Sequence, residues 1–216
     1  MSTQNFAELV TQGWPGLSKT TVDGLNTYRN LVLEASKVQN LTKLVEPEAF
    51  FEGHLIDCRE LLKTDYLKYP AMDLGSGAGV PGVVCAWVGG GDWVLAESEG
   101  RKAEFLQSVV DTLPLKTARV FSGRAEKYLK TQTVGSVVCR AVGTVGKILG
   151  WIEKCSTWNN LILFKGPGWE KEWEEFQKKD ARLAKQIQVA STHEYVVGTE
   201  NKRRLIVNLV PRRTIS

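Results

Sequence analysis

Before residue 70 the hydrophobic residues recur at helical spacing in two stretches. Between residues 18 and 39, apolar side chains return every three or four positions, which predicts one amphipathic helix ending before 40–42. Pro47 fits the first turn of a second helix. The apolar side of that helix includes Phe50, Phe51, Leu55, Leu61 and Leu62. We therefore expect residues 1–69 to form an N-terminal helical extension.

From residue 70 onward, short apolar runs alternate with helix-patterned stretches. The runs are residues 70–74, 93–97, 118–122, 136–141 and 160–165. The clearest helix covers 100–113, where Pro114 stops the apolar stripe. Two last β-rich runs, 186–197 and 204–210, are joined by 198–201 and predict a terminal antiparallel hairpin. The alternation predicts an α/β fold for residues 70–216, with a mainly parallel, doubly wound, seven-stranded sheet.

A glycine-rich segment, DLGSGAGVPG at residues 73–82, follows the first predicted strand. Its glycines at 75, 77 and 79 allow a tight turn and leave no side chains between the backbone and a ligand. Pro81 is placed to open the next helix. Glu97 ends the second strand, where a carboxylate can accept hydrogen bonds from ribose hydroxyls. This arrangement predicts a cofactor that contains a nucleoside.

The glycine spacing favours one cofactor class over another. The dinucleotide fingerprint GxGxxG needs a glycine at position 80, but the chain has Val80 there and its third glycine at Gly79. This spacing favours S-adenosylmethionine over NAD, because no pyrophosphate has to be held. An oxidoreductase that uses a dinucleotide remains the alternative. The glycines could also form only a turn without binding a ligand, but a simple turn needs fewer of them.

Polar residues gather at the ends of the later strands as well. Arg124, Ala125 and Glu126 follow the third strand, Arg140 ends the fourth and Lys165 ends the fifth. Ligands of open α/β sheets bind outside the carboxyl ends of the strands, where the strand order reverses. Strands one and four should flank that point, which predicts that the glycine segment lies beside Arg140. Any one charge could be an ordinary solvated strand end, but their recurrence favours a site.

Composition excludes several classes of protein. The chain has 216 residues with 43% hydrophobic and 24% charged side chains, as in one globular domain, and a net charge of +4. No two of its four cysteines have CxxC spacing, and it has two histidines, so we expect no metal site. Without a secretory signal or an apolar run of about 18 residues, we expect a cytoplasmic monomer that does not contact membranes.

In order along the chain, DLGSGAGVPG, AES-x-x-RK-x-x-FL, GRAE, CRAV and FKG resemble the RsmG (GidB) family, over roughly residues 25–170. The resemblance implies a Rossmann-like, S-adenosylmethionine-dependent methyltransferase. Its partner would be 16S ribosomal RNA or the small ribosomal subunit, and its target N7 of one guanine, position 527. The chain departs from the family pattern at Val80 and at Val84-Cys85. Both departures exchange one apolar residue for another and affect packing rather than activity.

The resemblance, together with the positions above, gives a set of expected site residues. We expect Arg140 to be the catalytic contact, and Arg124 and Lys165 to contact RNA. The expected cofactor contacts are Asp73, Gly75, Gly77, Gly79, Val80, Glu97, Ala125, Glu126 and Arg140. Further candidates for RNA contact are Lys147 and the basic tail residues Lys202, Arg203, Arg204, Arg212 and Arg213.

The expected chemistry needs no general base, because guanine N7 already carries an exposed lone pair and alignment alone can drive the transfer. Cys139 could suggest a nucleophile, but we expect a buried strand cysteine. Likewise, we expect Trp169, Trp173 and Phe176 to be core residues and His54 to be structural. Three other functions remain open: methylation of another RNA, methylation of a small molecule, and a non-catalytic RNA-binding module.

Overall fold

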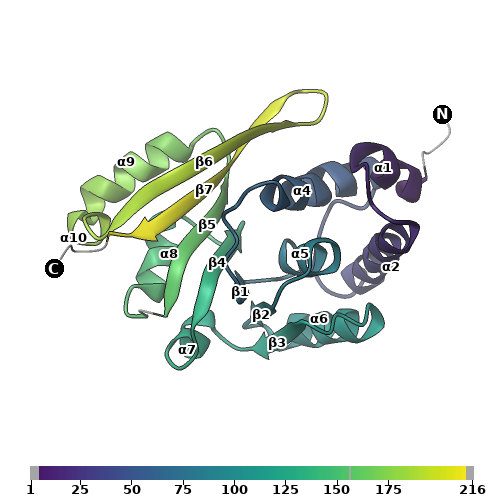
Figure 1. The fold of residues 1–216 in the computed structure, drawn as a ribbon, viewed down its shortest axis with the longest axis horizontal. Coiled ribbons are helices and arrows are strands. Elements are labelled where there is room, and N and C mark those ends of the chain that lie inside the picture. The colour runs from purple at the N-terminus through teal and green to yellow at the C-terminus, as the bar shows by residue number, and fades with distance from the viewer. Residues whose placement is uncertain (1–4, 156, 213–216) are drawn as a thin grey trace.

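One seven-stranded sheet runs through the computed structural model, which describes residues 5–155 and 157–212 (Figure 1). Its strands are β1 (Ala71–Leu74), β2 (Trp93–Glu97), β3 (Ala118–Ser122), β4 (Val134–Arg140), β5 (Trp158–Lys165), β6 (Ile187–Val197) and β7 (Lys202–Pro211). The spatial order is β3-β2-β1-β4-β5-β7-β6. The first five strands are parallel, and β7 is antiparallel to both β5 and β6. The predicted sheet and its terminal hairpin are confirmed.

The helices lie between and before these strands. Their bounds are α1 (Phe6–Gly13), α2 (Lys19–Ser36), α3 (Pro47–Phe50), the π-helical turn η1 (Phe51–Leu55), α4 (Ile56–Leu62), α5 (Gly82–Gly89), α6 (Gly100–Thr112), α7 (Ala125–Leu129), α8 (Val145–Ile152), α9 (Trp169–Lys179) and α10 (Ala181–Ala184). Pro81 immediately precedes α5 and Pro114 follows α6, as the sequence predicts. None of the helices in the described ranges is long and apolar enough to cross a membrane.

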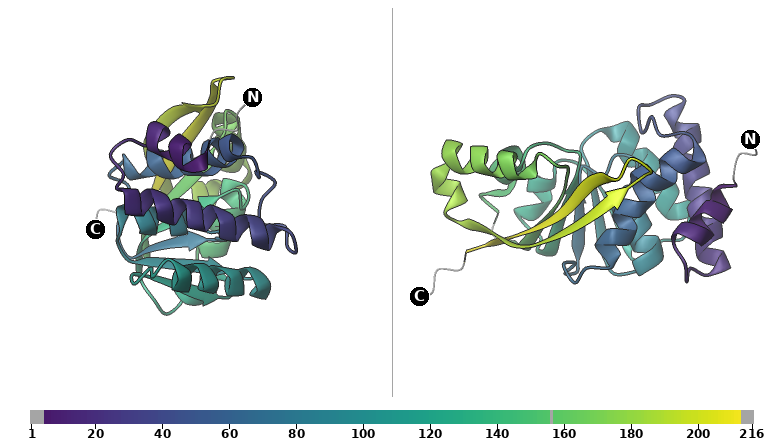
Figure 2. Two further views of the ribbon diagram at one scale, coloured as in Figure 1. Left: turned by 90° about the vertical axis from the view of Figure 1, so that its right-hand side faces the viewer. Right: turned by 90° about the horizontal axis from the view of Figure 1, so that it is seen from above.

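The sheet separates two hydrophobic cores because successive strand residues point to opposite faces. Ala71 and Val138 belong to the core under α1, α2, α4, α5 and α6. Their neighbours Met72 and Val137 belong to the core under α7, α8, α9 and α10. Figure 2 shows these two helical layers on either side of the strands. Trp169 and Phe176 are buried in the second core, and Trp173 packs against it, as expected.

The N-terminal region contains one more helix than the sequence analysis predicts. The helix α1 was missed, although Asn5 caps it and it buries Phe6 and Val10. The predicted first helix is α2, capped by Ser18. The predicted second helix starts at Pro47 but contains the π-helical turn η1 before α4. A helix as short as α1 offers too few turns for its periodicity to stand out.

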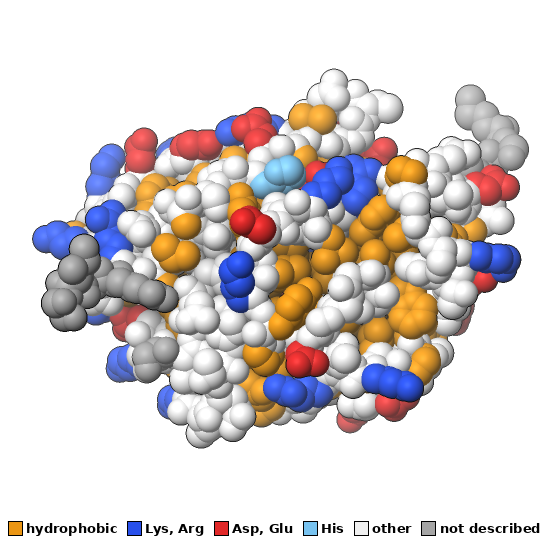
Figure 3. All heavy atoms as spheres, in the orientation of Figure 1, with side chains coloured by type: hydrophobic (Ala, Val, Ile, Leu, Met, Phe, Trp, Pro, Cys, Tyr) orange, Lys and Arg blue, Asp and Glu red, His pale blue; other side chains and the backbone are white. Residues whose placement is uncertain are grey.

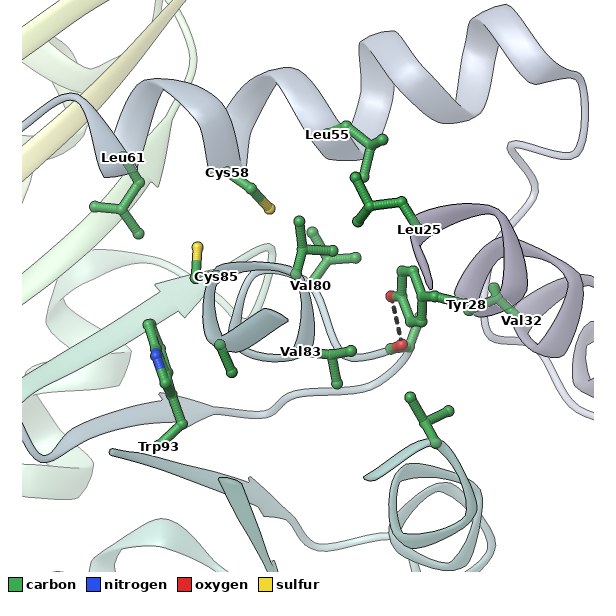
Figure 4. Packing of buried hydrophobic residues seen from close by; sticks show 14 of the residues in the cluster. Leu25, Tyr28, Val32, Leu55, Cys58, Leu61, Val80, Val83, Cys85 and Trp93 are labelled. Carbon is green, nitrogen blue, oxygen red and sulfur yellow. Dashed lines mark hydrogen bonds between the residues drawn. The ribbon is translucent and has the colours of Figure 1, made fainter. Parts of the chain in front are cut away.

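The N-terminal helices share a core with the sheet and touch the glycine-rich segment directly. Tyr28 of α2 is fully buried, and its hydroxyl donates a 2.7 Å hydrogen bond to the carbonyl of Ala78 (Figure 4). The indole of Trp87 on α5 donates to the carbonyl of Thr21 on α2. The helical extension therefore supports the turn that follows β1, and its presence affects the shape of that turn.

The point where the strand order reverses lies between β1 and β4. Asp73 is paired with Val138 across these parallel strands, so the glycine loop after β1 and Arg140 at the end of β4 lie at the same edge of the sheet. The chain continues from β1 toward β2 on one side and from β4 toward β5 on the other. The predicted placement of the glycine-rich segment beside Arg140 is confirmed.

Candidate functional site

The glycine loop, residues 75–79, depends on backbone conformations that side chains disfavour. Gly75, Gly77 and Gly79 have φ values of 73°, 54° and 96°, in the left-handed region. A Cβ atom on Gly75 would also lie 3.1 Å from a methyl group of Val142, the residue that faces the loop from beyond β4. The loop is anchored to β2, because the amides of Gly75 and Ser76 donate to the carbonyl of Ala96. These glycines therefore open a narrow backbone cradle.

Asp73 lies beneath the glycine loop and fixes its far end. The side chain is 1% exposed, and its carboxylate accepts a 2.8 Å hydrogen bond from the amide of Gly82 at the start of α5. Burial raises the pKa of Asp73 to about 7, although the Gly82 hydrogen bond opposes that rise. We observe Asp73 holding the loop; a direct contact with a cofactor remains a prediction.

Glu97 ends β2 next to the glycine loop and is also largely buried. One carboxylate oxygen accepts from the amide of Gly77 at 3.0 Å, and the other accepts from the amide of Glu99 at 2.9 Å. Each carboxylate oxygen can accept more than one hydrogen bond. Glu97 therefore fixes the loop and still has lone pairs that could accept from a pair of hydroxyl groups.

A small hollow, called here the loop hollow, opens between the glycine loop and the start of α7. Its volume is about 90 Å³. Its lining residues are Leu74, Gly75, Ala96, Ser98, Gly123, Arg124, Ala125, Glu126, Val142 and Trp151. The structure thus brings together Gly75, Arg124, Ala125 and Glu126, as the sequence predicts. Val142 and Trp151 were missed, although Val142 belongs to the CRAV motif.

Val80 occupies a different environment from the residues of the loop hollow. It is 6% exposed and packs among Leu55, Cys58 and Val83 in the core below the loop (Figure 4).

A backbone cradle, a nearby carboxylate and a hollow with Ala96 and Val142 in its lining together suit a nucleoside that carries a short chain. S-adenosylmethionine has this form, so the residues present fit it, with Val80 as a packing residue beneath it.

Arg140 projects from the end of β4 toward the N-terminal helices and not into the loop hollow. Its Nε donates to Asp57 at 2.8 Å, one terminal nitrogen contacts Nδ1 of His54 at 3.1 Å, and the other donates to the carbonyl of Gly53. The Arg140 side chain is 18% exposed. A guanidinium has five N–H donors. Two of them therefore have no partner among the residues that the structure describes.

Asp57 connects Arg140 to the terminal hairpin. Its second carboxylate oxygen accepts hydrogen bonds of 2.6 Å from the Tyr195 hydroxyl on β6 and from Arg204 on β7. Only 4% of the Asp57 side chain is exposed, and burial together with Asp57 raises the pKa of Tyr195 well above its ordinary value. We call Arg140, His54, Asp57, Tyr195 and Arg204 the Arg140 cluster. The contact of Arg140 with Asp57, and those of Tyr195 and Arg204 with the same carboxylate, were not predicted from the sequence.

The geometry assigns the protonation state of His54. Arginine can only donate, so Nδ1 of His54 accepts from Arg140 and Nε2 carries the proton, which it donates to Thr42 at 2.9 Å. Burial and the neighbouring Arg140 lower the pKa of His54 to about 4. His54 is thus a buried neutral group with both nitrogens used, which confirms the structural role expected for it.

Several predicted RNA contacts are already engaged within the protein. Lys165 is 9% exposed along its side chain and pairs with Glu172 at 2.7 Å. On the hairpin, Arg203 pairs with Glu194 and Glu170, and Arg204 belongs to the Arg140 cluster. Arg124 is exposed at the rim of the loop hollow. Arg213 lies outside the described residues.

The face of the molecule in Figure 3 shows acidic and basic side chains interspersed, without one extended patch of a single sign. Cys139 is buried, and burial raises the pKa of its thiol, as expected for a packed strand cysteine. In residues 5–155 and 157–212 we find no group of three or more His, Cys, Asp or Glu side chains that could hold a metal ion.

Comparisons with known proteins agree with this architecture. Residues 21–206 match the family model described as rRNA small subunit methyltransferase G, GidB. A Ribosomal RNA small subunit methyltransferase G of Rhodopirellula baltica is 31% identical over 171 residues, which cover 78% of this chain and 74% of that protein.

Solved structures with lower identity share the fold. An O-methyltransferase from Bacillus cereus, in complex with SAH, has a TM-score of 0.54 at 14% identity and covers 94% of this chain and 96% of that one. M. capricolum TrmK, in complex with S-adenosyl-homocysteine, has a TM-score of 0.55 at 8% identity, with 73% and 68% covered. At these identities the likeness concerns the fold alone.

Proposed function

The chain belongs to the rRNA small subunit methyltransferase G family, and on that premise we propose that it transfers a methyl group from S-adenosylmethionine to N7 of a guanine in small-subunit ribosomal RNA. The nucleotide would be position 527 of 16S ribosomal RNA, as the resemblance of its motifs implies. The observation that carries the proposal is the glycine loop at the carboxyl end of β1, beside Glu97 and one strand from Arg140.

Different residues around the glycine loop would hold different parts of the cofactor. In our proposal the backbone of 75–79 receives the amino-acid end, and Glu97 accepts hydrogen bonds from the ribose hydroxyls. The adenine ring would lie in the loop hollow against Ala125 and Val142, and the backbone at Glu126 would contact it. Asp73 acts indirectly, by holding the start of α5 against the loop.

The chemistry requires alignment and no proton transfer from N7. When bound, S-adenosylmethionine supplies a methyl group on a sulfonium sulfur. In the transfer, the N7 lone pair would form the new carbon–nitrogen bond, and the electron pair of the broken carbon–sulfur bond would stay on sulfur. No side chain has to remove a proton, which agrees with a neutral His54 and a buried Asp73 that are both already hydrogen-bonded. The protein contributes orientation and the exclusion of water.

The direct test is methyl transfer from labelled S-adenosylmethionine to small ribosomal subunits that lack the modification. Strand cleavage specific for N7-methylguanine then maps the product. We expect label at a single guanine. If S-adenosylmethionine binds but no label appears in the ribosomal RNA, the proposed substrate is wrong while the cofactor assignment stands.

Arg140 is the side chain whose replacement should affect transfer most. We expect Arg140→Ala to reduce methylation at least 100-fold, because two of its N–H donors have no partner among the described residues and are available to a substrate. Since this change also disturbs the cluster, Arg140→Lys serves as a second variant that keeps a charge at Asp57. Circular dichroism checks folding, and calorimetry measures cofactor affinity. Turnover at the wild-type level in folded Arg140→Ala protein would remove Arg140 from the site.

A further inference from the structure

A second and larger cleft is separate from the loop hollow and shares none of its lining residues. We call it the hairpin cleft, and its volume is about 410 Å³. It opens between the η1 turn at Glu52–Gly53 and the tip of the β6–β7 hairpin at Gly198, with Arg140 in its lining. Figures 1 and 2 show the hairpin tip beside the helical segment that contains η1 and α4. Volumes of 300–1,000 Å³ are typical of ligand sites.

Most charged groups of the hairpin cleft already have an ion-pair partner. Arg204 pairs with Asp57 at 2.6 Å, and Lys202 pairs with Glu200 at 2.9 Å. The Glu52 carboxylate is different: within the described part of the chain it has no ion-pair or side-chain hydrogen-bond partner. It is half-buried, and one of its oxygens would lie 2.9 Å from a Cβ atom on Gly198. A side chain at position 198 would therefore crowd this carboxylate.

Three groups in the hairpin cleft remain available to a ligand. One is Arg204, whose contacts to Glu52 and Asp57 use only one terminal nitrogen among the described residues. Glu52 offers an acceptor that carries a negative charge, and Arg140 offers the two N–H donors that the cluster leaves unused. Apolar side chains from both walls, Leu44 and Ala49 on one side and Val197 on the other, can cover the faces of a flat ring.

We infer that the hairpin cleft receives the target guanine base, with Glu52 accepting hydrogen bonds from N1–H and the N2 amino group and Arg140 donating to O6. This inference rests on the proposed function. That proposal does not say which residues recognise the base, and the inference assigns this role to Glu52 and Arg140. Guanine presents two donors beside one acceptor on this edge, which matches a carboxylate beside a guanidinium. Adenine presents an acceptor at N1 and a donor at N6, so both contacts would be mismatched. Glu52 therefore selects guanine.

The same pose places the reacting atom correctly. N7 lies next to O6 on the ring, so a base whose O6 meets Arg140 has N7 on the Arg140 side of the cleft. β1 and β4 are neighbouring parallel strands about 4.8 Å apart, and the glycine loop and Arg140 both lie at their carboxyl ends. N7 would then face the glycine loop while Glu52 holds the opposite edge. Enzymes that modify a base take it out of its stack into such a cleft.

The test is a double-mutant cycle between Glu52 and the guanine amino group. Small subunits are reconstituted with guanosine or with inosine, which lacks the N2 amino group, at the target position. In the wild type we expect inosine to lower kcat/KM at least tenfold. In Glu52→Gln, kcat/KM for the guanosine substrate should fall at least tenfold relative to wild type. The further fall on changing guanosine to inosine should then be less than threefold. Glu48→Gln, an exposed acid on α3 outside the cleft, is the matched control and should behave as wild type.

Cofactor affinity by calorimetry and folding by circular dichroism should be unchanged in Glu52→Gln. An inosine penalty equal in wild type and Glu52→Gln would overturn the inference even if methylation occurs. If the wild type methylates no ribosomal RNA, the proposed function fails, and binding of guanosine monophosphate in the presence of S-adenosyl-homocysteine decides the inference separately. Binding that weakens in Glu52→Gln supports the cleft as a guanine site; binding that does not weaken, or its absence, overturns it.

Discussion

The glycine loop and the Arg140 cluster are neighbours on β1 and β4, but they are assembled in opposite ways. The loop and its two supports, Asp73 and Glu97, come from 25 consecutive positions, 73 to 97, and are joined by backbone amides. The Arg140 cluster unites residues from η1, α4, β4, β6 and β7, with partners up to 147 positions apart. Apart from the hydrogen bond from Tyr28 to Ala78, the loop is built from local contacts, whereas the cluster exists only in the folded chain.

Because of this difference, substitutions in the two regions should have different effects. A defect in the glycine loop should weaken ligand binding and leave most tertiary contacts intact. A defect in the Arg140 cluster leaves partly buried charges unpaired at the junction of three parts of the fold, so it should cost global stability. Each of the following experiments tests this contrast.

The largest effect is expected for Asp57→Ala. The change removes the acceptor shared by Arg140, Tyr195 and Arg204, leaving two cations without their buried counter-charge. We expect the free energy of unfolding to fall by about 3–5 kcal/mol, as measured by urea denaturation. Asp111→Ala, an exposed acid on α6, should change it by less than about 0.5 kcal/mol. Equal losses in the two variants would contradict a structural role for the cluster.

A smaller effect, on binding, is expected for Glu97→Gln. The amide nitrogen cannot accept a hydrogen bond, so the carboxamide loses one of the contacts to Gly77, Glu99 or a ribose hydroxyl. We expect affinity for S-adenosylmethionine to fall by about 1–3 kcal/mol in calorimetry, with a smaller change in stability than for Asp57→Ala. Glu104→Gln on the exposed side of α6 is the control. Unchanged affinity would mean that the carboxylate serves only the loop.

The smallest expected effect is a difference between the two regions in how they make folding stability depend on pH. The pKa of His54 in the cluster is lowered to about 4, so its contribution to stability is lost as pH falls from about 6.5 toward 4. The pKa of Asp73 beneath the loop is raised to about 7, so its contribution is lost as pH rises from about 4 toward 7. The two slopes oppose each other, and we expect a nearly flat stability profile in wild type.

Removing either group should uncover the slope of the other. Between pH 4.5 and 6.5, the stability of Asp73→Asn should rise with pH and that of His54→Gln should fall, each by at most about 1.4 kcal/mol per pH unit. Urea denaturation at three pH values measures both slopes, and Asp111→Asn should follow wild type. Parallel profiles in the two variants would contradict opposite titrations at the loop and the cluster.

Much of the fold was predictable because its signals are short-range. The five parallel strands, α6 and the terminal hairpin follow from periodicity and from breakers such as Pro114. The glycine loop was predictable because glycine spacing reports backbone conformation directly. By contrast, α1 was missed because eight residues carry too little periodicity, and the π-helical turn η1 has no sequence signal in the helical pattern around it.

The sequence by itself determined the order of the strands, the clearest helices, the glycine loop, and the presence of Glu97 and Arg140 at strand ends, since each depends on neighbours along the chain. Only the tertiary structure decided what those side chains do. It buried Val80 below the loop, paired Lys165 with Glu172, turned Arg140 toward Asp57, and left Glu52 as a carboxylate without a partner among the described residues. The interaction energy of two charges depends on the distance between them, and only the folded chain sets that distance.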